Sequence, residues 1–107
     1  MQIYQTVLGE PIELELLGDD GCALDLSLYD EDESFLRLEY PTATVDKAIR
    51  FAEDGNKVYY DVVEGDFDEG ETVLGQIFMI KVETGVVTRR KPLPIFNIEV
   101  LRILEAP

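Results

Sequence analysis

The chain has 107 residues, a length typical of one domain and too short for two separate hydrophobic cores. It carries 23 acidic and 9 basic residues, and the resulting net charge of −14 argues against nonspecific binding to nucleic acid or anionic membranes, which needs a positive field. Hydrophobic residues make up 46% of the chain, too large a share for a disordered segment.

Several kinds of chemistry lack their usual residues in this sequence. Cys22 is the only cysteine, so no internal disulfide can form and we expect a cytosolic setting, with Cys22 packed as a small hydrophobe. Histidine, the commonest acid–base catalyst and metal ligand near neutral pH, is absent. Neither a signal peptide nor an apolar run of roughly 20 residues is present. We therefore expect a soluble protein that is not an enzyme, holds no cofactor or bound metal, and contacts neither nucleic acid nor a membrane directly.

Apolar and polar residues alternate in the first half of the chain, as in strands that bury one face. Residues 12–16 form the first such stretch, and Gly18-Asp19-Asp20-Gly21 after it predicts a turn. Alternation returns over residues 36–40 until Pro41 interrupts it. Each stretch indicates a strand with one wet face.

The middle of the chain contains a hairpin signal. Residues 49–51 and 58–62 are apolar at alternate positions and flank Asp54-Gly55-Asn56, a typical turn sequence. The one segment where a short helix is an alternative is Thr44 to Ala52, with Thr44 as its N-cap.

The second half of the chain predicts longer strands. Residues 73–82 are β-prone, and Glu83-Thr84-Gly85 is a turn sequence. Pro92 and Pro94 indicate an edge or a connection, because proline cannot donate to a ladder. Residues 95–104 form the closing strand. The face expected to meet the core holds Phe96, Ile98, Val100, Arg102 and Leu104.

These patterns together predict an all-β fold, a single-domain antiparallel β-sandwich of seven or eight short strands over residues 1–107, with at most one short helix near 44–52. If the closing strand lay at a sheet edge it would need a partner strand, because an exposed apolar edge invites pairing. We therefore expect a homo-oligomer.

The segment VEGDFDEGE (63–71) carries five carboxylates in nine residues. As an EF-hand loop that starts at Glu64, it has Glu69 where glycine is required and Gly75 where the last glutamate is required. A weak cation site is the remaining metal hypothesis. Its candidate ligands are Glu64, Asp66, Asp68 and Glu71. The interpretation we favour is a solvated connection between two strands.

A basic patch stands out on this acidic chain. Thr88-Arg89-Arg90-Lys91 holds three of the nine basic residues and precedes Pro92-Leu93-Pro94. Arg89 and Lys91 could simply pair with acids on neighbouring strands. Alternatively, Arg89, Arg90 and Lys91 form a docking surface for an acidic partner, for which the Glu64–Glu71 loop of another copy is one candidate. Leu93 would be an exposed apolar anchor beside it.

The order of these landmarks resembles a family of immunoglobulin-like modules in phage tail and baseplate proteins, typified by the N-terminal domain of the baseplate upper protein. The matching segments are GEPIEL (9–14), DGCALDL (20–26), DGNKV (54–58), GQIFMIKV (75–82), and Val87-Thr88 leading through Pro92 to IFNIEV (95–100). The resemblance implies an immunoglobulin-like sandwich and a non-enzymatic structural protein of a tailed phage or related particle. Its partners would be other virion proteins or further copies of itself, in the host cytoplasm during assembly and then in the virion.

A second function, from a different class, follows from the acidic charge. Together with Asp30-Glu31-Asp32-Glu33, the 63–71 segment could imitate the phosphate spacing of DNA. The chain would then be an acidic inhibitor of a host enzyme that binds nucleic acid, with its carboxylates spread along one face. An assembly module would instead confine them to the tips of loops.

Overall fold

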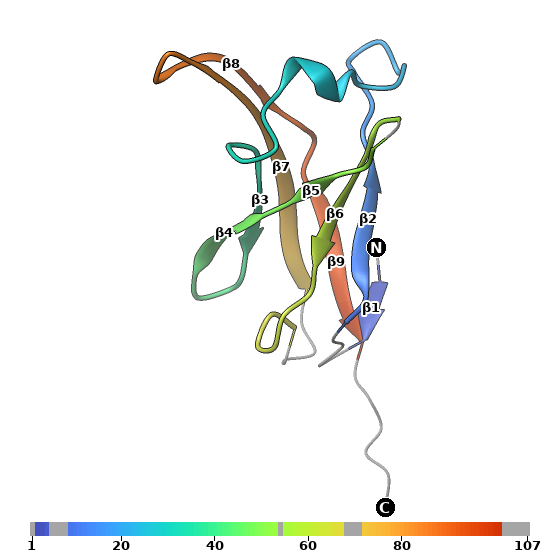
Figure 1. Cartoon of the computed structure of the whole chain (residues 1–107). Coiled ribbons are helices and arrows are strands. Elements are labelled where there is room, and N and C mark those ends of the chain that lie inside the picture. Colours follow the sequence, from blue (N-terminus) through green and yellow to red (C-terminus); the bar gives the residue numbers. More distant parts are fainter. Residues whose placement is uncertain (1, 5–8, 54, 68–71, 102–107) are drawn as a thin grey trace, which may run out of the picture.

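The computed structural model describes residues 2–4, 9–53, 55–67 and 72–101. In this part of the chain, nearly all regular structure is β, and two sheets face one another (Figure 1). Only one helical turn occurs there, and no helix in it is long and apolar enough to cross a membrane. The all-β prediction is confirmed.

The larger sheet has six strands. Five of them follow the order β1-β9-β7-β3-β4, and β8 pairs with β7 beside β9. Their bounds are β1 Gln2–Tyr4, β3 Phe35–Glu39, β4 Thr44–Ala48, β7 Thr72–Glu83, β8 Val86–Pro92 and β9 Phe96–Leu101. Because β1 runs parallel to β9 while the other pairs are antiparallel, the sheet is mixed rather than wholly antiparallel as predicted.

The smaller sheet has three antiparallel strands in the order β2-β6-β5. Their bounds are β2 Pro11–Glu15, β5 Arg50–Phe51 and β6 Lys57–Asp61. The 3-10 turn η1, Leu26–Leu28, lies on the connection from β2 to β3 and begins at Asp25, whose carboxylate accepts a hydrogen bond from the Ser27 N–H. With nine strands in the described residues, the fold has more strands than the seven or eight expected.

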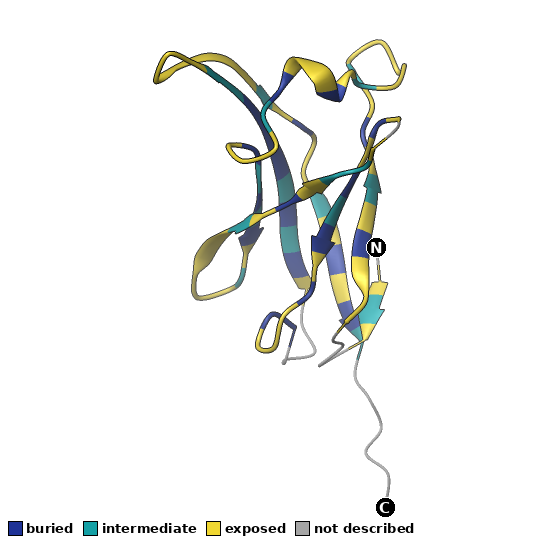
Figure 2. Ribbon diagram, viewed as in Figure 1, coloured by how far each residue is buried: buried dark blue, intermediate teal, exposed yellow. Residues whose placement is uncertain are grey.

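The core lies between the two sheets (Figure 2). Along β7, Val73, Ile77 and Met79 point inward and are almost fully buried. Val58 and Tyr60 of β6 face them from the smaller sheet. The two-residue period of these strands therefore placed the apolar face correctly, and the same holds for the closing strand. Its buried residues are Ile98 and Val100, with Phe96 partly buried.

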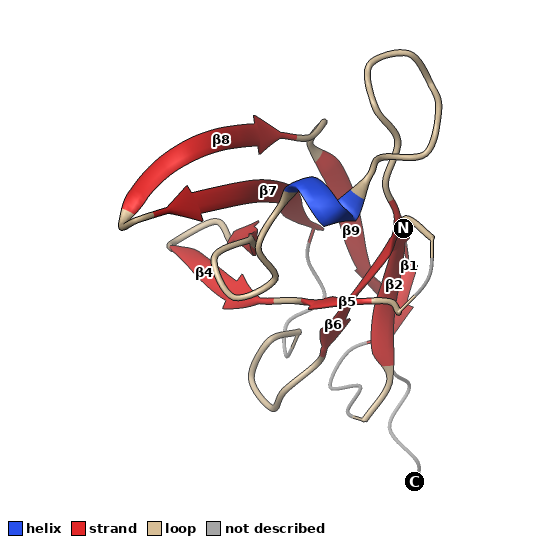
Figure 3. Ribbon diagram, turned by 45° about the horizontal axis from the view of Figure 1, so that its top comes forward, coloured by secondary structure: helices blue, strands red, loops and turns tan. Residues whose placement is uncertain are grey.

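The segment that allowed a helix forms two strands instead. β4 pairs with β3 in the larger sheet, and β5 pairs with β6 in the smaller one. The chain changes sheets at Ile49, whose side chain is buried in the core. Tertiary pairing on both sheets outweighs the weak helix signal, and the crossing closes one side of the sandwich (Figure 3).

The closing strand does not lie at an edge. β9 is paired with β7 on one side and with β1 on the other. The homo-oligomer stays a prediction, and the position of β9 gives no support to it. The strand's expected last residues, 102–104, lie outside the described part of the chain.

The predicted turn at Glu83-Thr84-Gly85 joins β7 to β8. Thr84 has φ +50° and Gly85 has φ +78°. Two central residues with positive φ are typical of the type I′ turn, whose twist matches that of a hairpin. The turn prediction is therefore confirmed, and the resulting hairpin carries β8 along the upper half of β7.

Gly75 on β7 lies opposite Phe96, and a Cβ there would stand 2.6 Å from Cζ of that ring. Gly75→Ala is therefore expected to lower the free energy of unfolding by about 1–3 kcal/mol through overpacking, as measured by urea denaturation. The double variant with Phe96→Leu should lose less free energy of unfolding than the sum of the two single losses, by at least ~0.5 kcal/mol. Simple additivity would show that the ring does not cover this glycine.

Candidate functional site: a basic edge strand and the groove beside it

β8 is an edge strand. Within the described residues it pairs with β7 alone, and its side chains from Val86 to Arg90 are exposed (Figures 2 and 3). The exposed fractions of Val86 and Val87 reach 60% and 56%. An edge of this kind presents unpaired backbone N–H and C=O groups to solvent.

A bulge divides β8. Arg89 pairs with Lys81 and Val87 with Val82, which leaves Thr88 as the extra residue. Beyond the bulge, Lys91 lies opposite the buried Met79, and side chains alternate between the two faces of the strand. Arg89 and Lys91 therefore share the inner face, whereas Arg90 lies on the outer face. The predicted basic patch is split across two faces of the sheet.

Arg90 is held by the ring of Phe78 on the outer face. Its guanidinium carbon lies 5.5 Å from the centroid of Phe78, and Arg37 lies 4.8 Å from the same ring. Phe78 stacks on Phe35 with centroids 5.0 Å apart. Arg37 also pairs with Asp46 at 2.8 Å, and this hydrogen bond lowers the pKa of the Asp46 carboxyl. Cation–π contacts therefore tie Arg90 to its own sheet.

Lys91 and Arg89 differ in their partners. Lys91 Nζ lies 2.7 Å from a carboxylate oxygen of Asp19, on the turn after β2, so this pair links the two sheets. Arg89 has neither an ion-pair nor a ring partner among the residues that the structure describes. Of the three predicted cations, Arg89 is thus the one available to an outside carboxylate without a competitor.

Leu93 is not the exposed anchor that the sequence suggested. Its N–H donates to the Ile77 carbonyl at 2.9 Å, its carbonyl accepts a hydrogen bond from Gln76, and its exposed fraction is only 6%. Although Pro92 and Pro94 cannot donate, this one hydrogen bond keeps the connection on β7 and turns the Leu93 side chain inward. Ile95, 61% exposed, is the apolar residue that faces solvent.

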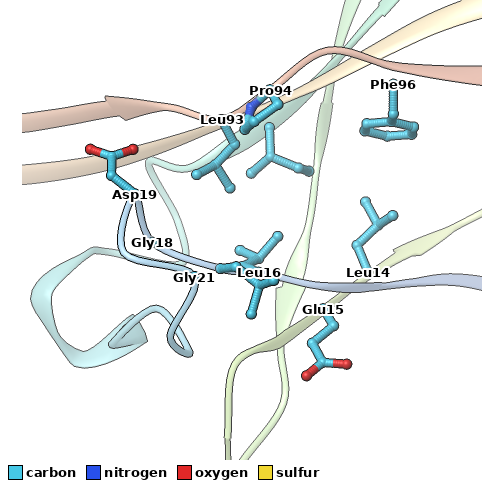
Figure 4. Close-up of a pocket in the computed structure, with 11 residues that line it drawn as sticks. Leu14, Glu15, Leu16, Gly18, Asp19, Gly21, Leu93, Pro94 and Phe96 are labelled. Atoms are coloured by element: carbon cyan, nitrogen blue, oxygen red, sulfur yellow. The ribbon is translucent and has the colours of Figure 1, made fainter.

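A groove of about 420 Å³ opens between the sheets beside this connection (Figure 4). Its apolar walls are Leu93, Pro94 and Phe96 from the larger sheet and Leu14, Leu16 and Leu17 from the β2 side. Ile77 of β7 also lines it, and Asp19 stands at its rim, whereas the Glu15 carboxylate points away from it. The groove lies on the side of the sandwich opposite the β4–β5 crossing.

The acidic 63–71 segment serves the fold at two positions. Asp66 and Phe67 are 4% and 2% exposed, so the interpretation of a wholly solvated connection is wrong for them. The Tyr60 hydroxyl and the Val63 N–H both donate to Asp66, and Lys47 pairs with it at 3.2 Å. Only the Val63 contact is local, because Tyr60 lies on β6 and Lys47 on β4, whereas Asp66 lies in the turn after β6.

The described residues include only one of the other three candidate cation ligands. Glu64 is exposed, and Asp68 and Glu71 lie outside the described residues. Within the described residues, no three acidic or cysteine side chains form a group that could hold a metal ion. Cys22 is free and exposed, which corrects the expectation of a packed small hydrophobe.

Asp30, in the second acidic run, also has a structural role. Its carboxylate accepts hydrogen bonds from the Val82 N–H at 2.9 Å and from Lys81 Nζ at 3.1 Å. These two partners, the Val82 N–H first, lower the pKa of Asp30. Its own N–H donates to the Ile80 carbonyl, and Ser34 Oγ accepts from the Ile80 N–H. Asp30 and Ser34 thus provide hydrogen-bond partners for the backbone groups of β7 beyond the end of β3.

Comparison with known proteins yields no match for this chain. No family model matches it, and neither a curated protein nor a solved structure does.

The buried Tyr60 predicts a loss of stability in alkali. Burial and the hydrogen bond to Asp66 raise the pKa of the Tyr60 phenol above its usual range. A raised pKa in the folded state means that the contribution of Tyr60 is complete below about pH 10 and is lost as the pH rises further. The free energy of unfolding should then fall above about pH 10, by up to ~1.4 kcal/mol per pH unit for this one group.

Tyr60→Phe is the control, since it retains the ring and has no phenol to titrate. Urea denaturation from about pH 8 to 11 should show a shallower decline for this variant than for the wild type. Parallel curves would mean that the Tyr60 hydroxyl does not titrate differently in the folded protein.

Proposed function

We propose that the chain is a non-enzymatic assembly module of a tailed phage or a related particle, and that it contacts other subunits through β8. The observation that carries this proposal is the position of Arg89, Arg90 and Lys91 on an edge strand of a chain whose net charge is −14. A strand edge with complementary charge is a surface on which a protein partner can be oriented.

The strand order supports an immunoglobulin-like assignment. In that fold strands A, B, E and D form one sheet and C, F and G the other, with C′ added in the variable type. Here β2, β6 and β5 stand where B, E and D would be. β3, β4, β7 and β9 take the places of C, C′, F and G. This order agrees with the resemblance of the sequence to the modules of phage tails and baseplates.

The short range of electrostatic interactions favours contact between β8 and an acidic protein surface. At physiological ionic strength the screening length is about 8 Å, so a group that touches β8 responds to nearby cations more than to the net charge of −14. An acidic surface on another subunit meets this condition. The module would reach that subunit in the host cytoplasm and remain with it in the particle.

A second copy of the chain is the less suitable partner for β8. Pairing of β8 with β8 would bring Arg89, Arg90 and Lys91 close to the same cations of the other copy, and like charges across a strand pair are destabilising. In the described residues the apolar strand β9 is already paired with β7 on one side and with β1 on the other. We therefore place the contact with a different subunit.

Photo-cross-linking in the producing host cell tests this function. One variant carries a photo-reactive phenylalanine analogue at Thr88, exposed on β8, and the control carries it at Val45, on the opposite edge of the same sheet. The expected result is a covalent adduct between Thr88 and a structural subunit of a particle, with little adduct from Val45. Adducts with a nuclease or polymerase would instead support the hypothesis of an acidic inhibitor that imitates DNA. Equal labelling from both positions would show that β8 is not the contact surface.

A further inference from the structure

We propose that β8 and the groove form one composite site for an extended segment of another protein. The segment carries carboxylates that meet Arg89 and Lys91, and a large apolar side chain that enters the groove. The inference rests on the proposed function, because it gives the chemistry of the partner at the same surface.

The backbone of β8 supplies the first part of the site. An extended segment can add to an unpaired strand edge, with main-chain hydrogen bonds for affinity and side-chain pockets for specificity. β8 leads directly into Leu93 and Pro94, which form one wall of the groove. Arg89 and Leu93 are four residues apart, which is roughly 13 Å of extended chain. The carboxylates and the apolar side chain of the partner should therefore be separated by about the same distance.

The two inner-face cations supply the charge selectivity. Arg89 has no acidic partner among the described residues, so an incoming carboxylate displaces nothing there. Lys91 is held by Asp19, but the side chain of Asp19 is 93% exposed. An exposed ion pair contributes little to stability, so a partner carboxylate can take the place of Asp19 at small cost.

The groove supplies the apolar part of the site. Its volume of about 420 Å³ lies within the range of cavities that bind small molecules or large side chains. Leu14 and Phe96, which line it from opposite sides, are only partly buried, so part of its apolar surface remains open to solvent. A phenylalanine or leucine side chain would cover this surface, whereas a charged one would lose its hydration there.

The same features also fit a simpler explanation, in which charges, a bulge and a proline protect an edge strand against aggregation. Edge protection accounts for Arg89, Thr88 and Pro92. It does not require an apolar groove at the end of the strand, and it predicts that acidic strands bind no better than neutral ones. The two explanations therefore differ in a measurable way.

Binding of synthetic peptides to the full chain tests the proposal. The probe is a fluorescein-labelled peptide with three glutamates at alternate positions and, two residues after the last of them, a phenylalanine. One control peptide has glutamine for each glutamate, and another has serine for phenylalanine. Fluorescence anisotropy at low salt should show affinity at least about fivefold higher for the probe than for either control.

Variants of the protein locate the site. Arg89→Gln should weaken probe binding roughly two- to fivefold, whereas Thr44→Glu, which changes the charge equally on the opposite edge, should leave it unchanged. Asp19→Asn should strengthen binding about twofold, because it frees Lys91. Leu14→Ala, which shortens a side chain that points across the groove toward Phe96, should weaken binding of the probe but not of the peptide that has serine for phenylalanine.

Three results would overturn the proposal. The first is that all three peptides bind with equal affinity or that none binds, which would indicate that these features only protect the strand edge. Equal losses in Arg89→Gln and Thr44→Glu would indicate only a general effect of net charge. A dimer in light scattering that Arg89→Gln abolishes would make a second copy the occupant.

Failure of this inference can be told apart from failure of the proposed function. Selective peptide binding together with cross-links to a nuclease or polymerase would leave the composite site in place and contradict the particle role. Cross-links from Thr88 to particle subunits without peptide selectivity would do the opposite.

Discussion

The structure depends on β7, the longest strand of the described residues, which has strand partners along its whole length and on both sides in its first half. β3 and β9 hold its first half, and β8 holds its second half. Its inner face, from Val73 to Met79, is covered by the smaller sheet. Burial of apolar surface is the main favourable contribution to the free energy of folding. Much of that surface lies on this face of β7, so the packing of the two sheets depends on this strand.

The free edge of β8 and the groove both follow from differences in strand length and number. β7 has 12 residues and β3 has five, so the upper half of β7 lacks a strand on that side, and side chains of Asp30 and Ser34 complete its hydrogen bonds. Three strands face six, and the β4–β5 crossing closes only one side of the sandwich. On the other side the larger sheet ends in β8 and its connection to β9, and the groove remains open.

Charge has an organising role in a chain this acidic. Three lysines hold loops to the sheets by pairing with aspartates: Lys47 with Asp66, Lys81 with Asp30, and Lys91 with Asp19. Each pair joins residues that are distant in the sequence, so these three lysines connect separate segments of the chain. Arg89 differs because no acidic side chain of the described residues reaches it, and this difference makes an external carboxylate its natural partner.

By itself, the sequence determined which faces of the strands are buried and where the chain turns, because a period of two and turn chemistry are local properties. Ile98 and Val100 are buried and Thr84-Gly85 forms a turn, as predicted. Only the tertiary structure decided the neighbours of each strand and the partners of each charge. Leu93 turns inward through a hydrogen bond to Ile77, and Asp66 is buried against Tyr60. Such contacts join residues that are distant in sequence or arise from packing against another strand, and no local pattern encodes them.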